Sequence, residues 1–360
     1  MTAALLQGLR VLDVGIWRPV PYATQLLAEM GAEVLKVEPP GGDPMRVFPP
    51  LFAVLNAGKR SIVVDLKTDE GRGEVVALAA EADAFLEGFR PGVAERLGVG
   101  YEALRAVNPA LVYCSISGYG ASGPLAAHPG HDVNYQAYAG VLSPRGGDPV
   151  TGSLPVGDLG AGMTAAMATV AACFRASRTG EGERIDVGIA DVLATWTGAV
   201  GQLTPVGCEQ PMNGLPGYGT YRTADDRHVG IGVLVEASFW SGLCRALGLD
   251  GLEGLGLNER IAKKDELDAD VAAAVARLPL REVVRRLEGL DVPVSPVLTR
   301  AEMLRLDHFR QRGTVLDDPD GSADRPVMGH PARYAVHRSV PPGAVPGLED
   351  AGGGRSWRAR

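Results

Sequence analysis

Short apolar runs alternate with amphipathic segments along the first 120 residues of this chain. The apolar runs predict strands at 10–14, 33–37, 61–66, 83–86 and 111–117. The segments between them predict helices at 21–30, 70–80 and 101–107. Helices of about ten residues between strands are typical of parallel βαβ crossovers. The pattern therefore predicts an α/β fold with a doubly wound, Rossmann-like sheet.

The second half of the chain predicts a different organisation. Two long apolar helices are expected at 159–177 and 186–203, followed by a Gly- and Pro-rich linker at 205–219. A hairpin at 218–223 and 228–233, and helices at 237–247, 265–277 and 280–289, then form a small α+β domain. Two prolines exclude a helix across 292–299, which we interpret as the return of the chain. We therefore expect a large domain from 1–205 and 293–360, with a small domain at 206–292.

Composition excludes several classes of function. The formal net charge of −8 argues against binding to nucleic acid, which requires clustered Lys and Arg. The four cysteines form no CxxC pair, so no zinc site or other metal site is expected. The chain begins without signal-peptide features, and its longest uncharged stretches fall short of a membrane span. We expect a cytoplasmic protein with neither a nucleic-acid nor a membrane partner.

A glycine loop follows the strand at 111–117. Gly118–Gly123 satisfies G-x-G-x-x-G, but Pro124 stands where a dinucleotide fingerprint requires the start of a helix. We expect instead a loop whose backbone approaches another ligand.

Three cations are candidates for holding an anion. Arg90 follows the strand at 83–86, at the sheet edge where open α/β sheets bind ligands, and a guanidinium suits a phosphate. Lys59 and Arg60 supply two more positive charges before the strand at 61–66. Solvated surface side chains are an equally good interpretation of all three.

A histidine and two acids suggest proton transfer. His131 lies in Gly-His-Asp-Val-Asn-Tyr at 130–135, and Asp158 lies among glycines at the head of the helix expected at 159–177. Glycines there would let a ligand approach the backbone. Glu236 begins a helix directly after a strand, from where a carboxylate could orient an imidazole. Taken singly, His131 fits a surface histidine, and Asp158 fits a helix N-cap with a lowered pKa.

These segments together resemble the class III coenzyme A transferases, a group that includes formyl-CoA transferase and α-methylacyl-CoA racemase. The matching segments are 8–13, 27–39, 56–67, 89–98, 115–120 and Gly157-Asp158. The resemblance implies an interlocked homodimer with a Rossmann-like large domain, a small α+β domain and an active site between them. It implies an acyl-CoA thioester substrate, with no cofactor beyond the CoA moiety and no metal. The residues that match its CoA-holding positions are Asn56, Lys59, Arg60 and Arg90, with Tyr135 near the thioester.

The motif at 130–135 favours one branch of this family. The racemase branch resembles Gly-His-Asp-x-Asn-Tyr and has a carboxylate matching Glu236 that pairs with the histidine. The resemblance thus implies a racemase or epimerase in which His131 and Asp158 exchange the α-proton of a 2-methylacyl-CoA on opposite faces of the carbon. The amides of 157–160 would stabilise the enolate. Asp132 would assist.

Two alternatives stay open. The first is a CoA transferase that uses Asp158 as a nucleophile and moves CoA between carboxylic acids. The second is a catalytically silent acyl-CoA-binding subunit. One departure from the family pattern also bears on the substrate, because Trp17 and Arg18 stand where most members have an Ala-Gly-Pro-like turn. Such a turn would suit a polar or aromatic acyl group rather than a branched fatty acyl group, although the sequence does not fix the acyl group.

Overall fold

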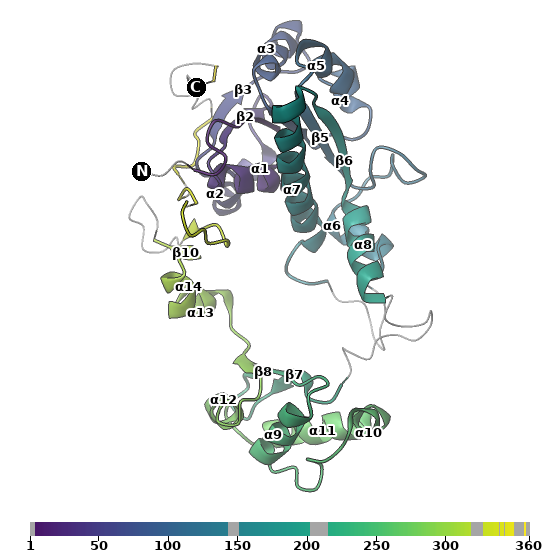
Figure 1. Ribbon diagram of the computed structural model, residues 1–360, viewed down its shortest axis with the longest axis vertical. Helices are drawn as coiled ribbons and strands as arrows, with labels where there is room; N and C mark the ends of the chain where they lie inside the picture. Colours follow the sequence, from purple (N-terminus) through teal and green to yellow (C-terminus); the bar gives the residue numbers. More distant parts are fainter. Residues whose placement is uncertain are drawn as a thin grey trace. The chain divides into compact units, whose positions relative to one another are not determined.

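The computed structural model describes residues 4–142, 151–201, 215–317, 327–337, 339–341, 343–348 and 356–357. Its internal contacts divide the chain into two compact units (Figure 1). The large unit comprises Met1–Gly198 and Asp307–Arg360, and the small unit comprises Ala199–Leu306. The domain boundary expected between 205 and 206 lies outside the described residues.

The large unit is built on a six-stranded sheet in the order β3-β2-β1-β4-β5-β6, in which every pair of neighbours is parallel. The strands are β1 (Arg10–Val14), β2 (Glu33–Glu38), β3 (Arg60–Val63), β4 (Ala84–Glu87), β5 (Val112–Ser117) and β6 (Glu183–Gly188). In the central register Leu12 lies beside Leu35 on one side and Phe85 on the other. The α/β class and the parallel sheet predicted from the sequence are confirmed.

Strand β6 corrects one prediction. The helix expected from 186 begins only at Ile189, as α8 (Ile189–Gly201), because 183–188 pair with β5 as an edge strand. Charged side chains alternate there with Ile185 and Val187, and this period of two is typical of a strand. The apolar sequence that follows made the whole segment resemble one helix.

Helices cover both faces of the sheet (Figure 1). On one face α1 (Pro19–Glu29) packs against α7 (Val156–Thr179), and on the other lie α3 (Asp69–Ala80) and α5 (Tyr101–Val107). Each face has its own core, with Leu27 and Ala165 in one and Phe85 and Leu104 in the other. Burial on both faces explains the apolar residues at the centres of β4 and β5, whereas β1 and β2 each contain a buried charge, Asp13 and Lys36. The remaining elements of this unit are η1 (Pro44–Val47), α2 (Pro49–Asn56), α4 (Val93–Arg96), α6 (Asp132–Tyr138), α14 (Asp307–Gln311), β10 (Val315–Leu316) and β11 (Val327–Met328).

Helix α7 is long and apolar. By length and composition alone it would suffice to cross a membrane, with a mean hydropathy of 1.3 in its most apolar window, and it is the one such helix among the described residues. A core helix of a soluble protein passes the same test. The Ala161 and Ala165 side chains of α7 are fully buried in the core shared with α1. One side of α7 therefore serves the packing of the large unit.

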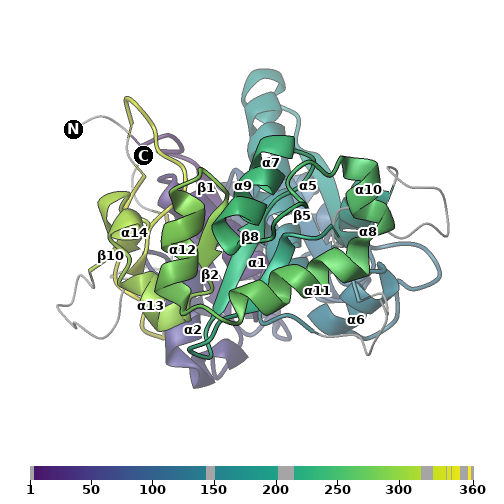
Figure 2. The same cartoon turned by 90° about the horizontal axis from the view of Figure 1, so that it is seen from below.

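The small unit holds a three-stranded antiparallel sheet in the order β7 (Tyr218–Arg222), β8 (His228–Gly232) and β9 (Val294–Pro296). Its helices are α9 (Ala237–Leu247), α10 (Leu257–Ala262), α11 (Lys264–Val275), α12 (Leu280–Glu288) and α13 (Arg300–Leu304). Helices α11 and α12 pack against the sheet, and α9 packs against both of these helices (Figure 2). The predicted hairpin and the three predicted helices are confirmed.

The return of the chain begins later than predicted. Residues from 293 were expected to rejoin the large domain, but Val294 of β9 pairs with Ile231 of β8. Prolines are tolerated on an edge strand, so the segment that cannot be helical extends the small sheet instead. The small unit therefore continues to Leu306.

Candidate active site

A cavity of about 710 Å³ opens at the carboxyl ends of β1, β4 and β5. The strand order reverses between β1 and β4, and crevices at such a position bind ligands in open α/β sheets. The loops after these strands supply the walls, together with side chains from α6 and α7. His131, Tyr135 and Asp158 all line this one cavity.

His131 is held at the start of α6. It is the N-cap residue of that helix and its side chain is exposed. Its backbone N–H donates to Oδ1 of Asn134 at 3.0 Å, and its carbonyl accepts from the Asn134 N–H at 2.8 Å. The predicted Asn134 therefore fixes the backbone of His131, which leaves the imidazole at the cavity.

Asp158 lies in the first turn of α7. The N-cap of that helix is Pro155, so the interpretation of Asp158 as an N-cap is wrong. Burial and then the nearby charge of Asp132 raise the pKa of the Asp158 carboxyl to about 6, against the opposing charge of Arg18. The lowered pKa that an N-cap would have is therefore not found. A carboxyl with this pKa exists in both protonation states near neutral pH.

Asp132 connects the two catalytic candidates. Its Oδ1 accepts the backbone N–H of Asp158 at 2.9 Å, and its Oδ2 accepts from the Gln136 amide. Asp132 thus ties the first turn of α7 to the first turn of α6, directly beside His131. The assisting role of Asp132 in proton transfer stays a prediction.

Tyr135 explains part of the glycine pattern. Its buried ring lies against Gly118, where an added Cβ would come within 2.4 Å of the ring. Its hydroxyl donates to the Gly130 carbonyl at 2.5 Å. Burial, followed by the charge of Asp158, raises the pKa of Tyr135 to about 12. Tyr135 is therefore a neutral hydrogen-bonding group at the cavity.

The glycines around Asp158 have a different role from the one predicted. A Cβ on Gly157 would lie 2.8 Å from Oδ1 of Asp132, and one on Gly160 would lie 2.5 Å from the Trp196 ring. Neighbouring side chains therefore fill the space that we expected a ligand to use.

Arg90 lies where the sequence predicted. It follows β4, lines the cavity, and its side chain is exposed. It also lines an adjoining cavity of about 210 Å³ with Glu87 and Arg184. Among the groups that act on Tyr135, Arg90 lowers the pKa, which places its positive charge near that hydroxyl. An anionic part of a ligand would meet this guanidinium.

Asn56 and Lys59 do not line the cavity. Lys59 is 4% exposed and Asn56 is completely buried. The Lys59 ammonium donates to Oδ2 of Asp13 at 2.9 Å, to Oγ1 of Thr24 at 2.8 Å and to Oδ1 of Asn56 at 3.0 Å. Burial lowers the pKa of Lys59 to about 8, although Asp13 opposes this. In this structure the two residues belong to a buried polar network, and a CoA-holding role for them stays a prediction.

A second buried ion pair completes that network. Lys36 and Asp43 are 2.9 Å apart, and both side chains are fully buried. Lys36 donates to the Gly15 carbonyl at 2.7 Å, while Asp43 Oδ1 accepts from the Trp17 N–H at 3.3 Å. On the other side, Oδ1 of Asp13 accepts from the Gly15 N–H at 3.0 Å. The network thus fixes the loop after β1 that forms one wall of the cavity.

Sequence reasoning missed Asp13, Lys36 and Asp43. The available signal was a charged residue inside each of two strands predicted to be buried. A charge in such a strand requires a partner, because an unpaired buried charge is strongly unfavourable. His128 was also missed, although it lines the same cavity as His131. Its only signal was its position three residues before His131.

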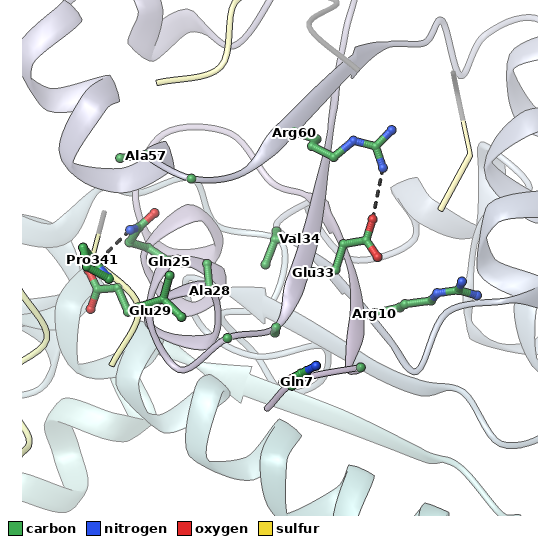
Figure 3. A pocket seen from close by; sticks show the side chains of 15 residues that line it. Gln7, Arg10, Gln25, Ala28, Glu29, Glu33, Val34, Ala57, Arg60 and Pro341 are labelled. Atoms are coloured by element: carbon green, nitrogen blue, oxygen red, sulfur yellow. Dashed lines mark hydrogen bonds and ion pairs between the residues drawn. The ribbon is translucent and has the colours of Figure 1, made fainter. Parts of the chain in front are cut away.

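Arg60 lies at the opposite edge of the sheet. It forms an ion pair with Glu33 at 3.1 Å and donates to the Ser356 carbonyl at 2.9 Å. It lines a second cavity of about 450 Å³ near the amino ends of β1 and β2, where Gln25 donates to Glu29 at 3.3 Å (Figure 3). The structure therefore does not bring Arg60 together with Arg90, and its predicted CoA contact stays a prediction.

Glu236 belongs to the small unit. It is the N-cap residue of α9 and follows β8, as the sequence predicted. Its Oε2 accepts the Leu234 N–H at 3.2 Å, and the buried Arg260 donates to the Leu234 carbonyl at 2.9 Å. These bonds define the segment that carries Glu236. Its pairing with His131 stays a prediction.

Within the residues that the structure describes, no three His, Cys, Asp or Glu side chains gather as metal ligands would.

Comparison with known proteins decides the family. The model of CoA-transferase family III matches residues 6–350. The chain belongs to CoA-transferase family III. The family predicted from the sequence is thus confirmed.

The relatives of this family III chain include both a racemase and CoA transferases. It is 34% identical to the α-methylacyl-CoA racemase of Homo sapiens over 94% of this chain and 88% of that protein. It is 32% identical to the succinyl-CoA:mesaconate CoA-transferase of Haloarcula marismortui over 96% of this chain and 94% of that protein. A CAIB/BAIF family protein from Brucella suis has the same fold, with a TM-score of 0.84 at 28% identity over 98% of both chains. The chain is therefore an enzyme of the family III transferase and racemase group.

Proposed function

We propose that this enzyme is an acyl-CoA racemase or epimerase that moves the α-proton of a 2-methylacyl-CoA or a related thioester. The observation that carries the proposal is that His131 and Asp158 line one cavity at the switch point of the sheet. Histidine is the side chain that most often serves as a general acid and base, and the Asp158 carboxyl, with a pKa of about 6, can both accept and donate a proton near neutral pH.

The reaction needs one group on each face of the α-carbon. His131 takes the proton, the C–H bond breaks, and its electron pair moves to the thioester oxygen as an enolate. Asp158 then gives its proton to the opposite face, and the reverse reaction exchanges the two roles. Glu236 orients the imidazole in this proposal, while Asp132 keeps the two helix starts together.

Fewer of the backbone amides of 157–160 are available to stabilise the enolate than the sequence predicted. The N–H of Asp158 already donates to Asp132, and the N–H of Leu159 donates to the Pro155 carbonyl at 3.1 Å. The N-terminal end of the long helix α7 still favours a negative charge through its dipole. Arg90 is a further group at the cavity that meets the developing oxyanion in this proposal, whereas the Tyr135 hydroxyl already donates to the Gly130 carbonyl.

The test is exchange of the α-proton in D₂O with a small panel of chiral 2-methylacyl-CoAs, followed by NMR. His131→Ala should lower the exchange rate by at least about 10²-fold, the usual contribution of one general acid or base. His128→Ala is the matched comparison, because it removes an imidazole from the same loop. Near-native exchange in His131→Ala, or a larger loss in His128→Ala, would contradict the assignment.

Transfer of CoA through Asp158 is the second candidate, since a transferase relative matches this chain almost as well as a racemase does. Attack by the Asp158 carboxylate would produce an aspartyl thioester on the enzyme. Hydroxylamine or borohydride trapping, with mass spectrometry of the peptide that contains Asp158, would detect it. A trapped adduct together with acyl exchange that survives His131→Ala would favour the transferase.

We also propose that the chain forms the interlocked homodimer implied by its family. The described part of α7 supports this, because Met163, Met167 and Phe174 are exposed large apolar side chains on that helix. An apolar surface of this kind is typical of an interface between protein chains.

A further inference from the structure

The second cavity, near the amino ends of β1 and β2, lies at the opposite ends of the strands from the cavity that holds His131 and Asp158. The proposed reaction does not use it. Small and apolar side chains form part of its wall, and these are Ala28, Ala32, Val34, Ala57, Val340 and Pro341. The polar groups among the other lining residues therefore decide which ligand it suits.

Helix α1 supplies an acceptor that lacks a donor. Gln25 lines the cavity and is only 3% exposed. Its Nε2 donates to Oε1 of Glu29 at 3.3 Å, whereas its own Oε1 has no hydrogen-bond partner among the described residues. Figure 3 shows Gln25 and Glu29 together at the cavity, next to Pro341. A buried carbonyl oxygen without a donor is unfavourable, so a ligand that donates to it stabilises the site.

Glu29 supplies a negative charge without a counterion. Its side chain is partly buried, and in the part of the chain that the structure describes neither Lys nor Arg forms an ion pair with it. Burial raises the pKa of this carboxyl to about 7, although the hydrogen bond from Gln25 and the charge of Lys59 oppose the rise. A cation at this carboxylate would compensate for the loss of water around it.

The two arginines at the cavity do not reverse its preference for a cation. Arg60 pairs with Glu33 at 3.1 Å, and Arg10 pairs with Glu81 at 3.2 Å. Each guanidinium is therefore compensated by a carboxylate of its own. In Figure 3 the pair of Arg60 and Glu33 lies apart from Glu29. The charge that the protein leaves uncompensated at this cavity is thus negative.

We propose that the second cavity is a binding site for a primary ammonium group on a short apolar chain. The ammonium group donates to the Glu29 carboxylate and to Oε1 of Gln25, and its three N–H donors satisfy both acceptors at once. The methylene groups lie against the apolar part of the wall. The site is separate from the proposed reaction at His131 and Asp158, and the proposal does not depend on that reaction.

Calorimetry with the full-length enzyme compares n-hexylammonium with 1-hexanol, which has the same chain and a neutral head group. The wild type should bind the ammonium ion about 10-fold or more tightly than the alcohol, because hydrogen bonds between charged groups are stronger than neutral ones. Equal affinity for the two probes, or no binding of hexylammonium, would overturn the proposal.

Glu29→Gln assigns the preference to this cavity. The substitution keeps the size of the side chain and an oxygen that can accept from Gln25, so the affinity for hexanol should stay unchanged while the preference for the ammonium ion disappears. Glu70→Gln is the matched control, because it changes the net charge equally at an exposed position that does not line the cavity. A preference that survives in Glu29→Gln, or that Glu70→Gln also loses, would show that the ammonium ion binds elsewhere.

Gln25→Met tests the second acceptor. It replaces the amide by an apolar side chain of similar length, and it should weaken the binding of hexylammonium by about 5-fold while hexanol binds as before. An equal loss of both probes would mean that Gln25 only shapes the cavity, and the proposed contact would fail. Circular dichroism checks that each variant folds. If Glu29→Gln does not fold, the comparison of the probes in the wild type and Gln25→Met still decides the outcome.

Discussion

At the scale of single residues, the protonation of Asp158 is set by groups that can be changed one at a time. Burial and the Asp132 charge raise the pKa of this carboxyl, and Arg18 opposes them. We expect Asp132→Asn to shift to lower pH the limb of the pH profile of kcat/KM that depends on Asp158, because the substitution removes a negative charge. The amide oxygen of the new side chain can still accept the Asp158 N–H. The pH dependence of α-deuterium exchange measures this, since kcat/KM reports the free enzyme.

Arg18→Met supplies the opposite control for that shift. Removal of the positive charge should move the same limb to higher pH, because Arg18 lowers the pKa of Asp158. The free enzyme should thus respond in opposite directions to the two variants. A shift in the same direction, or no shift in either, would mean that another group controls the limb.

The sequence predicted the positions of the candidate proton-transfer residues better than the positions of the candidate CoA-binding cations. His131 and Asp158 were predicted as a pair and do line one cavity. Lys59 and Arg60 are adjacent in sequence, yet one is buried against Asp13 and the other pairs with Glu33. Successive side chains at the start of a strand point to opposite faces, so adjacent cations cannot share one ligand there. Sequence alone does not reveal which strand edge or which buried acid each of them meets.

At the scale of elements, the buried ion pairs connect β1, β2 and β3 to the loop that forms the cavity wall. Lys59→Met should lower the free energy of unfolding by about 3–5 kcal/mol, because it removes one partner of a buried ion pair and leaves Asp13 less compensated. Urea unfolding followed by circular dichroism measures the change. Lys67→Met is the matched control, because Lys67 is exposed and its loss should change stability by less than about 0.5 kcal/mol. Equal effects of the two substitutions would show that the pair contributes nothing.

Elements were predictable wherever one pattern dominated. The apolar strands β1, β4 and β5, between polar helices, allowed their boundaries to be placed within one or two residues. Strand β6 was missed because it runs directly into the apolar helix α8, and Gly188 at the junction was not taken as the end of a strand. Strand β9 was taken for the return of the chain to the large domain, because Pro293 and Pro296 exclude a helix but not an edge strand. Both errors concern edge strands, whose weak pattern reflects partial burial.

At the scale of the whole molecule, buried carboxyls with opposite pKa shifts set the dependence of stability on pH. Burial raises the pKa of Glu29 and of Glu87 to about 7. Burial alone would also raise the pKa of Asp13, but Lys36 and Lys59 together lower it to about 2. Asp13 therefore contributes stability above its unfolded pKa, and that contribution is lost only in strong acid. The two glutamates act in the opposite sense.

A glutamate whose pKa is higher in the folded state binds its proton more tightly there than in the unfolded chain. Its contribution to stability is complete below the unfolded pKa of 4.5 and disappears as the pH rises through about 7. For Glu87, which is only 4% exposed, the loss is on the order of 3 kcal/mol. Urea unfolding at about pH 5.5, inside this range, and at about pH 8.5, above it, should therefore show a less stable protein at the higher pH. Glu87→Gln keeps an oxygen that can accept the Phe89 N–H, and it should remove the part of that difference that Glu87 contributes, while Glu29, whose pKa burial also raises to about 7, retains its own part. A variant that loses as much stability as the wild type between the two conditions would show that Glu87 is already ionised in the native protein.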